Sequence, residues 1–207
     1  MSAVRATEEP ATAVRILDVA ERLLQTRGYN GFSYGDVAGE LRITRAALHY
    51  HFRNKAELGR ALIDRYTGRF AAALDTLDAT ATDALGRLRG YSDLYRDVLR
   101  DDLMCLCGML AAEYQTLPGP LQHEVSAFFA RNSAWLGATL RQGSEEGSLR
   151  LPGTPEATAA MVLAGLEGAV LINRLDGDVG RFSAAAACLL DGLTSPAPRS
   201  GAALGDG

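Results

Sequence analysis

The chain has 207 residues, enough to bury a substantial core in one or two domains. Its formal charge of −4 at pH 7 argues against a protein coated with basic residues for general nucleic-acid affinity. The sequence has no apolar run approaching about 18 residues and no signal-peptide pattern at the start, so we expect no membrane span. It has only three cysteines, so we expect no disulfide framework and a cytoplasmic location.

The N-terminal part begins with a polar stretch followed by a helix. Residues 1–11 include a proline, and we predict a flexible arm there. From Thr12, which can cap a helix, apolar residues recur at helical spacing until Gly28, a typical helix end. We predict that this helix packs its apolar face on the elements that follow.

Two short helices joined by a tight turn come next. Ser33 is predicted to cap the first, and Asp36 three residues later completes a capping-box pattern. The turn is expected at Arg42-Ile43, and Thr44 is expected to cap the second helix, residues 45–52. This arrangement is typical of a helix-turn-helix.

The remainder of the chain is predicted to be helical, with no strand-like alternation. Asn54 and Glu57 form another capping-box pattern at the start of a long helix that runs to about Thr80. We therefore predict an all-α fold of about nine helices. The later helices are expected at residues 82–100, 101–114, 119–143, 154–174 and 180–193, with a loop at 147–153 and a disordered tail at 195–207.

The segment LHYHFRNKAEL, Leu48 to Leu58, carries a resemblance to a known family. Together with FS at Phe32, DVA at Asp36 and ITR at Ile43, it resembles the N-terminal DNA-binding domain of the tetracycline-repressor (TetR) family over roughly residues 12–60. The family usually has tyrosine where this chain has His49. The resemblance implies a helix-turn-helix DNA-binding domain at residues 12–56 and a helical ligand-binding and dimerisation domain at residues 57–194.

A recognition helix presents its first residues to base edges in the major groove. Arg45 could pair with a guanine, although a solvated or phosphate-bound Arg45 is the alternative, and two alanine methyls could pack against thymine. Hydroxyls, histidines and Lys55, the only lysine in the chain, are expected at phosphates. The side chains that we assign to DNA contact are Ser33, Tyr34, Thr44, Arg45, Ala46, Ala47, His49, Tyr50, His51 and Lys55.

Charge is distributed unevenly along the chain. Residues 1–66 carry 10 basic against 8 acidic side chains, whereas residues 67–207 carry 11 against 17. The basic excess at the DNA-binding end is small. Affinity for DNA is therefore expected to come from placed contacts and from two copies on one operator.

The resemblance also implies a small-molecule pocket in the C-terminal domain. An aromatic stripe at helical spacing is more often plain core than pocket, and an amide such as Asn132 inside an apolar stripe needs a partner, either a ligand or a neighbouring helix. Candidate lining residues are Phe70, Leu103, Cys107, Tyr114, Phe128, Asn132 and Trp135.

Several residues also bear on other possible functions. Cys105 and Cys107 could sense oxidants or electrophiles, although buried, inert thiols are the default. We expect no metal site, because His49 and His51 project from different faces of a helix, and no cofactor. No nucleophile elbow or phosphate loop indicates an enzyme, and a helical protein-interaction module without DNA binding is a further alternative.

The interpretation favoured by the sequence is a ligand-responsive transcriptional regulator. The family's common mode implies a repressor that binds a palindromic operator as a homodimer and is released by a small-molecule effector. The last two helices, with Ala160, Ala164 and Gly168 four residues apart, are expected to pair with their copies in the second chain.

Overall fold

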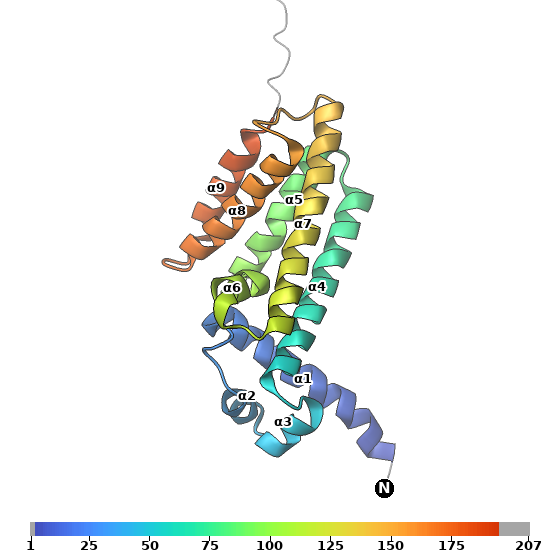
Figure 1. The fold of residues 1–207 in the computed structure, drawn as a ribbon, viewed down its shortest axis with the longest axis vertical. Coiled ribbons are helices and arrows are strands. Elements are labelled where there is room, and N and C mark those ends of the chain that lie inside the picture. The colour runs from blue at the N-terminus through green and yellow to red at the C-terminus, as the bar shows by residue number, and fades with distance from the viewer. Residues whose placement is uncertain (1–2, 195–207) are drawn as a thin grey trace, which may run out of the picture.

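The computed structural model describes the backbone of residues 3–194 and the side chains of residues 11–194. This part of the chain forms an all-α fold of nine α-helices and one short 3₁₀ helix, as predicted (Figure 1). The predicted tail, residues 195–207, lies outside the described residues. The helices are α1 (Ala3–Arg27), α2 (Tyr34–Leu41), α3 (Arg45–His51), α4 (Lys55–Thr80), α5 (Ala84–Arg100), α6 (Leu106–Ala112), η1 (Tyr114–Thr116), α7 (Gly119–Glu145), α8 (Pro155–Asn173) and α9 (Val179–Asp191).

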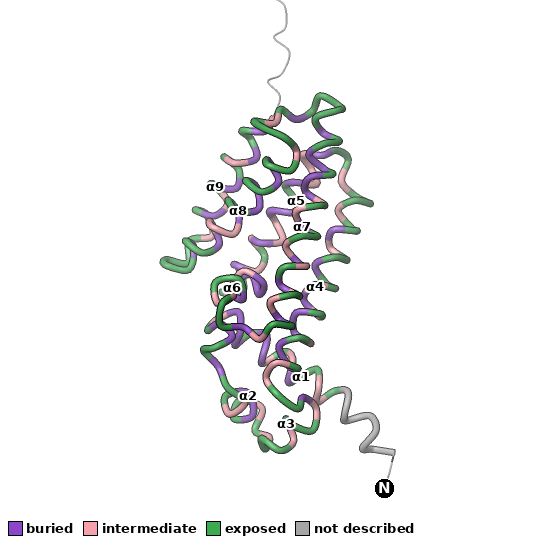
Figure 2. Tube along the Cα trace, in the orientation of Figure 1, coloured by how far each residue is buried: buried purple, intermediate pink, exposed green. Residues whose placement is uncertain are grey.

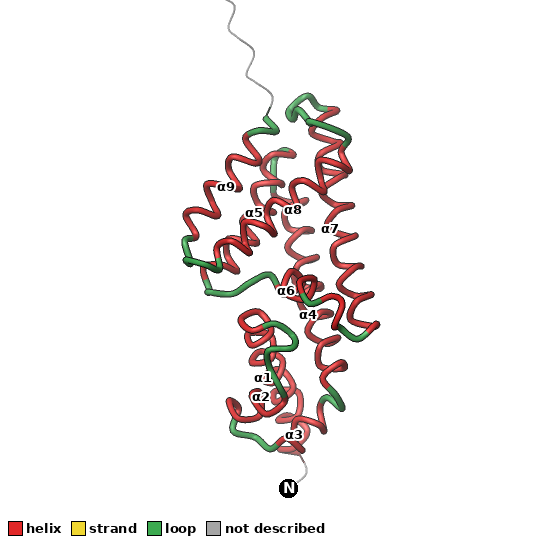
Figure 3. Tube along the Cα trace, turned by 60° about the vertical axis from the view of Figure 1, so that its left-hand side comes forward, coloured by secondary structure: helices red, strands yellow, loops and turns green. Residues whose placement is uncertain are grey.

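The helices form two groups along the long axis of the molecule. The helices α1, α2 and α3 lie at one end, and α4 starts among them and runs into a body made of α5, α7, α8 and α9 (Figure 1). The short helix α6 lies at the junction, and the loop that leads to it from α5 passes between the two groups (Figure 3). The α4 helix therefore connects the two parts through a single uninterrupted element.

The first helix is longer than the sequence analysis predicted. It begins at Ala3 rather than at Thr12, so most of the stretch assigned to a flexible arm is helical backbone. The predicted apolar face is buried at Ile16, Ala20 and Leu23, whereas Val14 is exposed. Among the described side chains of α1, burial begins at Ile16.

The start signals of the next two helices act as predicted. The Ser33 side chain accepts from the Asp36 amide, and the Asp36 carboxylate accepts from the Ser33 amide at 2.7 Å, which completes the capping box. The Thr44 hydroxyl accepts from the Ala47 amide at 3.1 Å. Between them Arg42 takes the left-handed conformation, with φ of 55°, and ends α2.

At the start of α4 the capping pattern differs in one detail. Asn54 caps the helix by accepting from the Glu57 amide at 2.9 Å, as predicted. The Glu57 carboxylate, however, accepts from the Arg53 amide at 3.1 Å. The Glu57 side chain therefore bonds to the residue before the cap, Arg53, and stabilises the turn between α3 and α4.

The helix predicted at residues 101–114 is wrong in its first part. The chain leaves α5 through a turn in which Asp102 has φ of 56° and the Leu103 amide donates to the Val98 carbonyl at 3.1 Å. Helix formation resumes only after Cys105, whose sulfur accepts from the Gly108 amide at 3.3 Å. The two consecutive aspartates thus mark the end of a helix rather than a change of face.

The core of the body is built around aromatic side chains. Phe70 of α4 lies edge-on to Tyr91 and Tyr95 of α5 and to Phe128 of α7, with ring centroids 5.2 to 6.1 Å apart. Figure 2 shows buried residues recurring along each helix of the body, with exposed ones between them. This pattern indicates one continuous core that holds α4, α5 and α7 together.

The α8 helix corrects the expectation that no segment is apolar enough for a membrane span. It has 19 residues with a mean hydropathy of 1.4, which meets that test by length and composition, and 33% of the tested window is buried. Core helices of soluble proteins pass the same test. Its apolar residues lie on both faces, and the outer face exposes Met161, Leu171 and Ile172.

Two glycines of α4 give opposite predictions for the same substitution. A Cβ at Gly59 would lie 2.9 Å from Leu121 Cδ1 and 3.1 Å from the Tyr29 ring, whereas a Cβ at Gly68 meets nothing within 4 Å. We expect Gly59→Ala to lower the free energy of unfolding by about 1–3 kcal/mol through overpacking. Gly68→Ala is expected to raise it by about 0.5–1 kcal/mol, because alanine loses less backbone entropy in a helix.

The measurement is urea unfolding of both variants and the native protein at one fixed protein concentration. Equal effects of the same sign would contradict the close approach of α4 to α7 at Gly59.

Candidate nucleic-acid interface and cavities

The helix-turn-helix is held together by one small core and one tyrosine. Val37 of α2 and Leu48 of α3 are fully buried. The Tyr34 hydroxyl donates to the Phe52 carbonyl at 2.9 Å, and its ring lies 4.8 Å from the His49 ring. Burial, with smaller contributions from Glu57 and Tyr29, raises the pKa of Tyr34 to about 12, so the hydroxyl keeps its proton and donates. Tyr34 therefore fixes the exit of α3 relative to α2.

The start of α3 presents a polar surface at one end of the molecule. Thr44, Arg45 and Ala46 are exposed, and Tyr50 one turn later is 71% exposed. An exposed aromatic ring of this size on a short helix is available to a partner surface. Ala47 and His51 are half-buried, and the His49 imidazole contacts the Arg53 carbonyl at 3.0 Å.

The Arg45 guanidinium lies against α2 at a position without a side chain. A Cβ at Gly35 would lie 2.6 Å from Arg45 Nη2, so glycine leaves the room that the guanidinium occupies. The sequence analysis did not single out Gly35, because nothing local indicates which side chain crosses over it.

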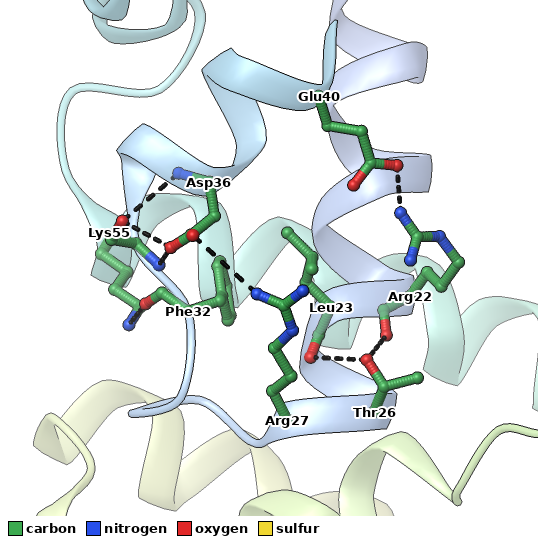
Figure 4. Close-up of polar contacts among 9 residues, drawn as sticks. Arg22, Leu23, Thr26, Arg27, Phe32, Asp36, Glu40 and Lys55 are labelled. Atoms are coloured by element: carbon green, nitrogen blue, oxygen red, sulfur yellow. Dashed lines mark hydrogen bonds and ion pairs between the residues drawn. The ribbon is translucent and has the colours of Figure 1, made fainter.

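Lys55 is engaged inside the domain. Its ammonium donates to the Phe32 carbonyl (Figure 4). The same ammonium lies 4.6 Å and 4.5 Å from the ring centroids of Tyr29 and Phe32. Burial lowers the pKa of Lys55, and the carboxylates of Glu113 and Asp36 act in the opposite direction. The lysine that was assigned to a phosphate thus also stabilises the loop before α2, and its phosphate contact stays a prediction.

Ion pairs attach α1 to its neighbours. Arg22 pairs with Glu40 of α2, and Arg27 lies 3.8 Å from Asp36 (Figure 4). The buried Glu21 accepts from Arg65 and Arg69 of α4. These contacts set the orientation of the helix-turn-helix on α1 and α4.

The α6 segment connects these helices to the body through hydrogen bonds at both of its ends. The buried Gln25 side chain of α1 donates to the Met104 carbonyl at 2.8 Å. The Glu113 carboxylate accepts from the Tyr29 amide at 2.5 Å and from the Asn30 amide at 3.2 Å. The sequence showed no signal for this junction, since its partners are about 80 residues apart.

Four of the seven side chains predicted to line a ligand pocket lie beside one small cavity. Phe70, Phe128, Asn132 and Trp135 border about 200 Å³ between α4 and α7. The Asn132 amide has protein partners, because Tyr91 donates to its oxygen at 3.1 Å and its nitrogen donates to the Phe128 carbonyl at 2.9 Å. A neighbouring helix is therefore one partner that the amide needed.

The other three predicted lining residues lie elsewhere. Leu103 borders two other cavities, one of about 150 Å³ near Gln25 and one of about 330 Å³ that it shares with Phe70. Cys107 is fully buried in α6, and the Tyr114 hydroxyl lies 3.1 Å from Ser126 Oγ. The structure does not bring the seven side chains together, and their role in ligand binding stays a prediction.

A larger cavity lies between α6, α7 and α8, where the sequence analysis did not place one. Its volume is about 440 Å³, within the range of small-molecule sites. Most of its lining is apolar, and the carboxyl of Glu167 is the acidic group on its wall. The full lining is Met104, Cys105, Gly108, Met109, Ala111, Ala112, Phe129, Ser133, Ala160, Leu163, Ala164, Glu167, Gly168, Val170 and Leu171.

The two thiols of α6 and its cap are buried and held in the protonated form. Cys105 and Cys107 are at most 1% exposed. Burial raises the pKa of both thiols, with a further contribution from Glu167, and the thiolate is the reactive form. These properties do not favour a thiol sensor.

The exposed start of α3 and the helical body joined to it by α4 define a class of protein. They describe a helix-turn-helix DNA-binding protein with a separate C-terminal helical domain. Residues 16–62 match the family model described as "Bacterial regulatory proteins, tetR family", and residues 84–189 match "Tetracyclin repressor-like, C-terminal domain". The chain belongs to the TetR family of bacterial transcriptional regulators, which are not enzymes.

Individual relatives agree with this assignment. A TetR-family transcriptional regulator from Agrobacterium tumefaciens has a similar crystal structure, with a TM-score of 0.87 and 34% identity, covering 90% of this chain and 99% of that chain. The transcriptional regulator AcuR of Cereibacter sphaeroides is 29% identical over 161 residues, 74% of this chain and 72% of the relative. The HTH-type transcriptional repressor DhaR of a Mycobacterium species is 22% identical over 165 residues, 78% of this chain and 81% of the relative.

The raised thiol pKa values predict slow alkylation. In the folded protein, Cys105 and Cys107 are expected to react with iodoacetamide at least about tenfold more slowly than in urea, since each pKa unit lowers the thiolate fraction about tenfold. Mass spectrometry of peptides after timed labelling at pH 8 gives the rate for each cysteine. Labelling of either residue at the unfolded rate would restore the thiol-sensor alternative.

Proposed function

We propose that this protein is a ligand-responsive repressor that acts in the cytoplasm and binds a palindromic operator as a homodimer. The observation that carries the DNA-binding role is the exposed N-terminus of α3, with Thr44, Arg45 and Ala46 open to a partner and Tyr50 one turn later. A relative named as a repressor, DhaR, supports the direction of control.

In the proposed complex, α3 enters the major groove and its first residues read bases. Arg45 pairs with a guanine and the Ala46 and Ala47 methyls contact thymine, with Tyr50 against the same groove. Ser33, Tyr34, Thr44, His49, His51 and Lys55 contact phosphates and fix the register. Hydroxyls at the starts of α2 and α3 are well placed for this role, because helix N-termini attract anions.

The proposed dimer forms through α8 and α9. The exposed face of α8 carries Ala157, Met161, Leu171 and Ile172, and a Cβ at Gly168 would meet nothing within 4 Å. A contiguous apolar face on a helix of a soluble protein indicates an interaction surface. Pairing with the second copy would bury it in a four-helix arrangement and place two recognition helices about 34 Å apart, one turn of DNA.

The proposed effector acts through the junction at α6. Met104 lines the 440 Å³ cavity, and its carbonyl accepts from Gln25 of α1. A ligand that moved this segment would change the position of the DNA-binding helices relative to the body. In this proposal the ligand favours a dimer whose recognition helices no longer fit successive grooves.

Substitution of Arg45 separates base reading from phosphate contact. Arg45→Ala is expected to weaken operator binding by about 1–3 kcal/mol and to relax the preference at one base pair. Arg60→Ala, an equal charge change at an exposed position of α4, is the matched control and should leave that preference intact. Fluorescence anisotropy with the operator and its single-base variants at two salt concentrations provides the measurement.

The alternative role of Arg45 predicts a different outcome. If it binds a phosphate, Arg45→Ala weakens all sequences alike and lowers the salt slope by about one unit. Failure of the native protein to select any sequence from random DNA would remove the proposed function altogether.

A charge on the exposed face of α8 tests the dimer. Ile172→Asp is expected to shift the protein from dimer to monomer and to weaken operator binding, because the interface would bury an unpaired carboxylate. Ala72→Asp, at an exposed position of α4, is the control and should leave the dimer unchanged. Sedimentation velocity at equal concentrations measures both, and an intact Ile172→Asp dimer would exclude this interface.

A further inference from the structure

One oxygen of the Glu167 carboxyl, Oε1, is a buried acceptor without a hydrogen-bond partner in the described part of the chain. This atom is inaccessible to solvent, although the rest of the side chain forms part of the wall of the 440 Å³ cavity. Buried polar oxygens are nearly always hydrogen-bonded, so an exception calls for an explanation. This residue was not among those that the sequence analysis selected.

The backbone of α6 makes room for this carboxyl. A Cβ at Gly108 would lie 2.4 Å from Glu167 Oε2, so the glycine leaves room for the carboxyl to lie against the helix. Cys105, which caps α6 through the Gly108 amide, lies on the same wall. The position of the acid is therefore built into the packing of α8 on α6.

The cavity lining around the carboxyl is mostly apolar and contains no basic side chain. None of the residues that line the cavity is lysine, arginine or histidine. The titratable neighbours are Cys105, Cys107, Tyr66, Tyr91 and Tyr95, of which Cys105 and Tyr95 lower the pKa of Glu167 by hydrogen bonding. Burial has the larger effect and raises it. A ligand that brings a positive charge would supply the cation that the cavity lining lacks.

We propose that the cavity between α6, α7 and α8 binds a small lipophilic amine, with its ammonium group on Glu167 and its hydrocarbon part against Met109, Phe129 and Leu163. This inference rests on the proposed function, since it names the chemical class of the effector. A charge-assisted hydrogen bond is roughly twice as strong as a neutral one, so an amine is preferred to an alcohol of the same size. A carboxylic acid is rejected because its charge would face Glu167 with no cation to offset the repulsion.

The cavity is open to the ligand on one side. Ala111 and Ala112 of α6 and Ala160, Ala164 and Leu171 of α8 are exposed at its rim. The α8 part of this rim adjoins the proposed dimer face, so the second copy would lie beside the entrance. For this reason the binding experiment uses the full-length protein.

The experiment compares three probes of equal chain length: hexylamine, hexanol and hexanoate. Isothermal titration of the purified full-length protein at pH 7 is expected to show hexylamine binding at least about tenfold more tightly than hexanol, a difference of 1.4 kcal/mol. Hexanoate is expected not to bind. Hexanoate binding as tight as that of hexylamine, or no hexylamine binding at millimolar concentration, would overturn the proposal.

Two variants assign the preference to Glu167. Glu167→Gln keeps the size of the side chain and is expected to weaken hexylamine binding at least about tenfold while changing hexanol binding less than about threefold. Glu145→Gln, the same charge change at an exposed position of α7, is expected to leave both unchanged. Undiminished hexylamine binding by a folded Glu167→Gln variant, as judged by its melting curve, contradicts the assignment.

A second readout separates this inference from the proposed function. Operator binding is measured by anisotropy in the same samples, with and without hexylamine. Operator binding by a protein that ignores hexylamine removes the inference and leaves the function. Hexylamine binding by a protein that selects no DNA sequence leaves the amine site and removes the function.

Discussion

The attachment of the helix-turn-helix to the body through α6 is the contact on which the rest of the structure depends. This helix has only seven residues, too few to be stable without its neighbours. One side of the segment supplies the Met104 carbonyl to Gln25, and Glu113 at its end receives the Tyr29 and Asn30 amides. The other side forms a wall of the largest cavity described. The same short helix therefore contributes both to packing in the body and to the position of the DNA-binding helices.

The body contains a buried polar side chain whose amide oxygen and nitrogen both have protein partners, and another side chain with a buried oxygen that has none. Asn132 lies in the aromatic core, yet Tyr91 and the Phe128 carbonyl meet both ends of its amide. Such a network specifies how α5 and α7 pack. Glu167 lies where Gly108 leaves room for it, and one of its oxygens has no partner. A closed network of this kind stabilises a fold, whereas an unsatisfied acid beside a cavity is the feature from which we infer the amine site.

The apolar surface of α8 has a different meaning from the core. The α8 helix packs on α7 and α9, seven of its 19 residues are buried, and the outer ones remain exposed in the single chain. Hydropathy alone treats the two faces alike, which is why the helix meets the composition test for a membrane span. In a family of DNA-binding regulators, the simplest partner for such a face is a second copy of the chain.

By itself, the sequence determined the features that depend on neighbours along the chain. The caps at Ser33, Thr44 and Asn54, the turn at Arg42 and the course of α4 were predicted correctly, because each rests on hydrogen bonds or periodicity spanning a few residues. The family was identified from LHYHFRNKAEL, which is also a short continuous stretch of the chain. Only the tertiary structure decided the break before α6, the engagement of Lys55 with Phe32 and the cavity at Glu167. These depend on contacts between residues far apart in the chain, whose distances and burial exist only after the helices have packed.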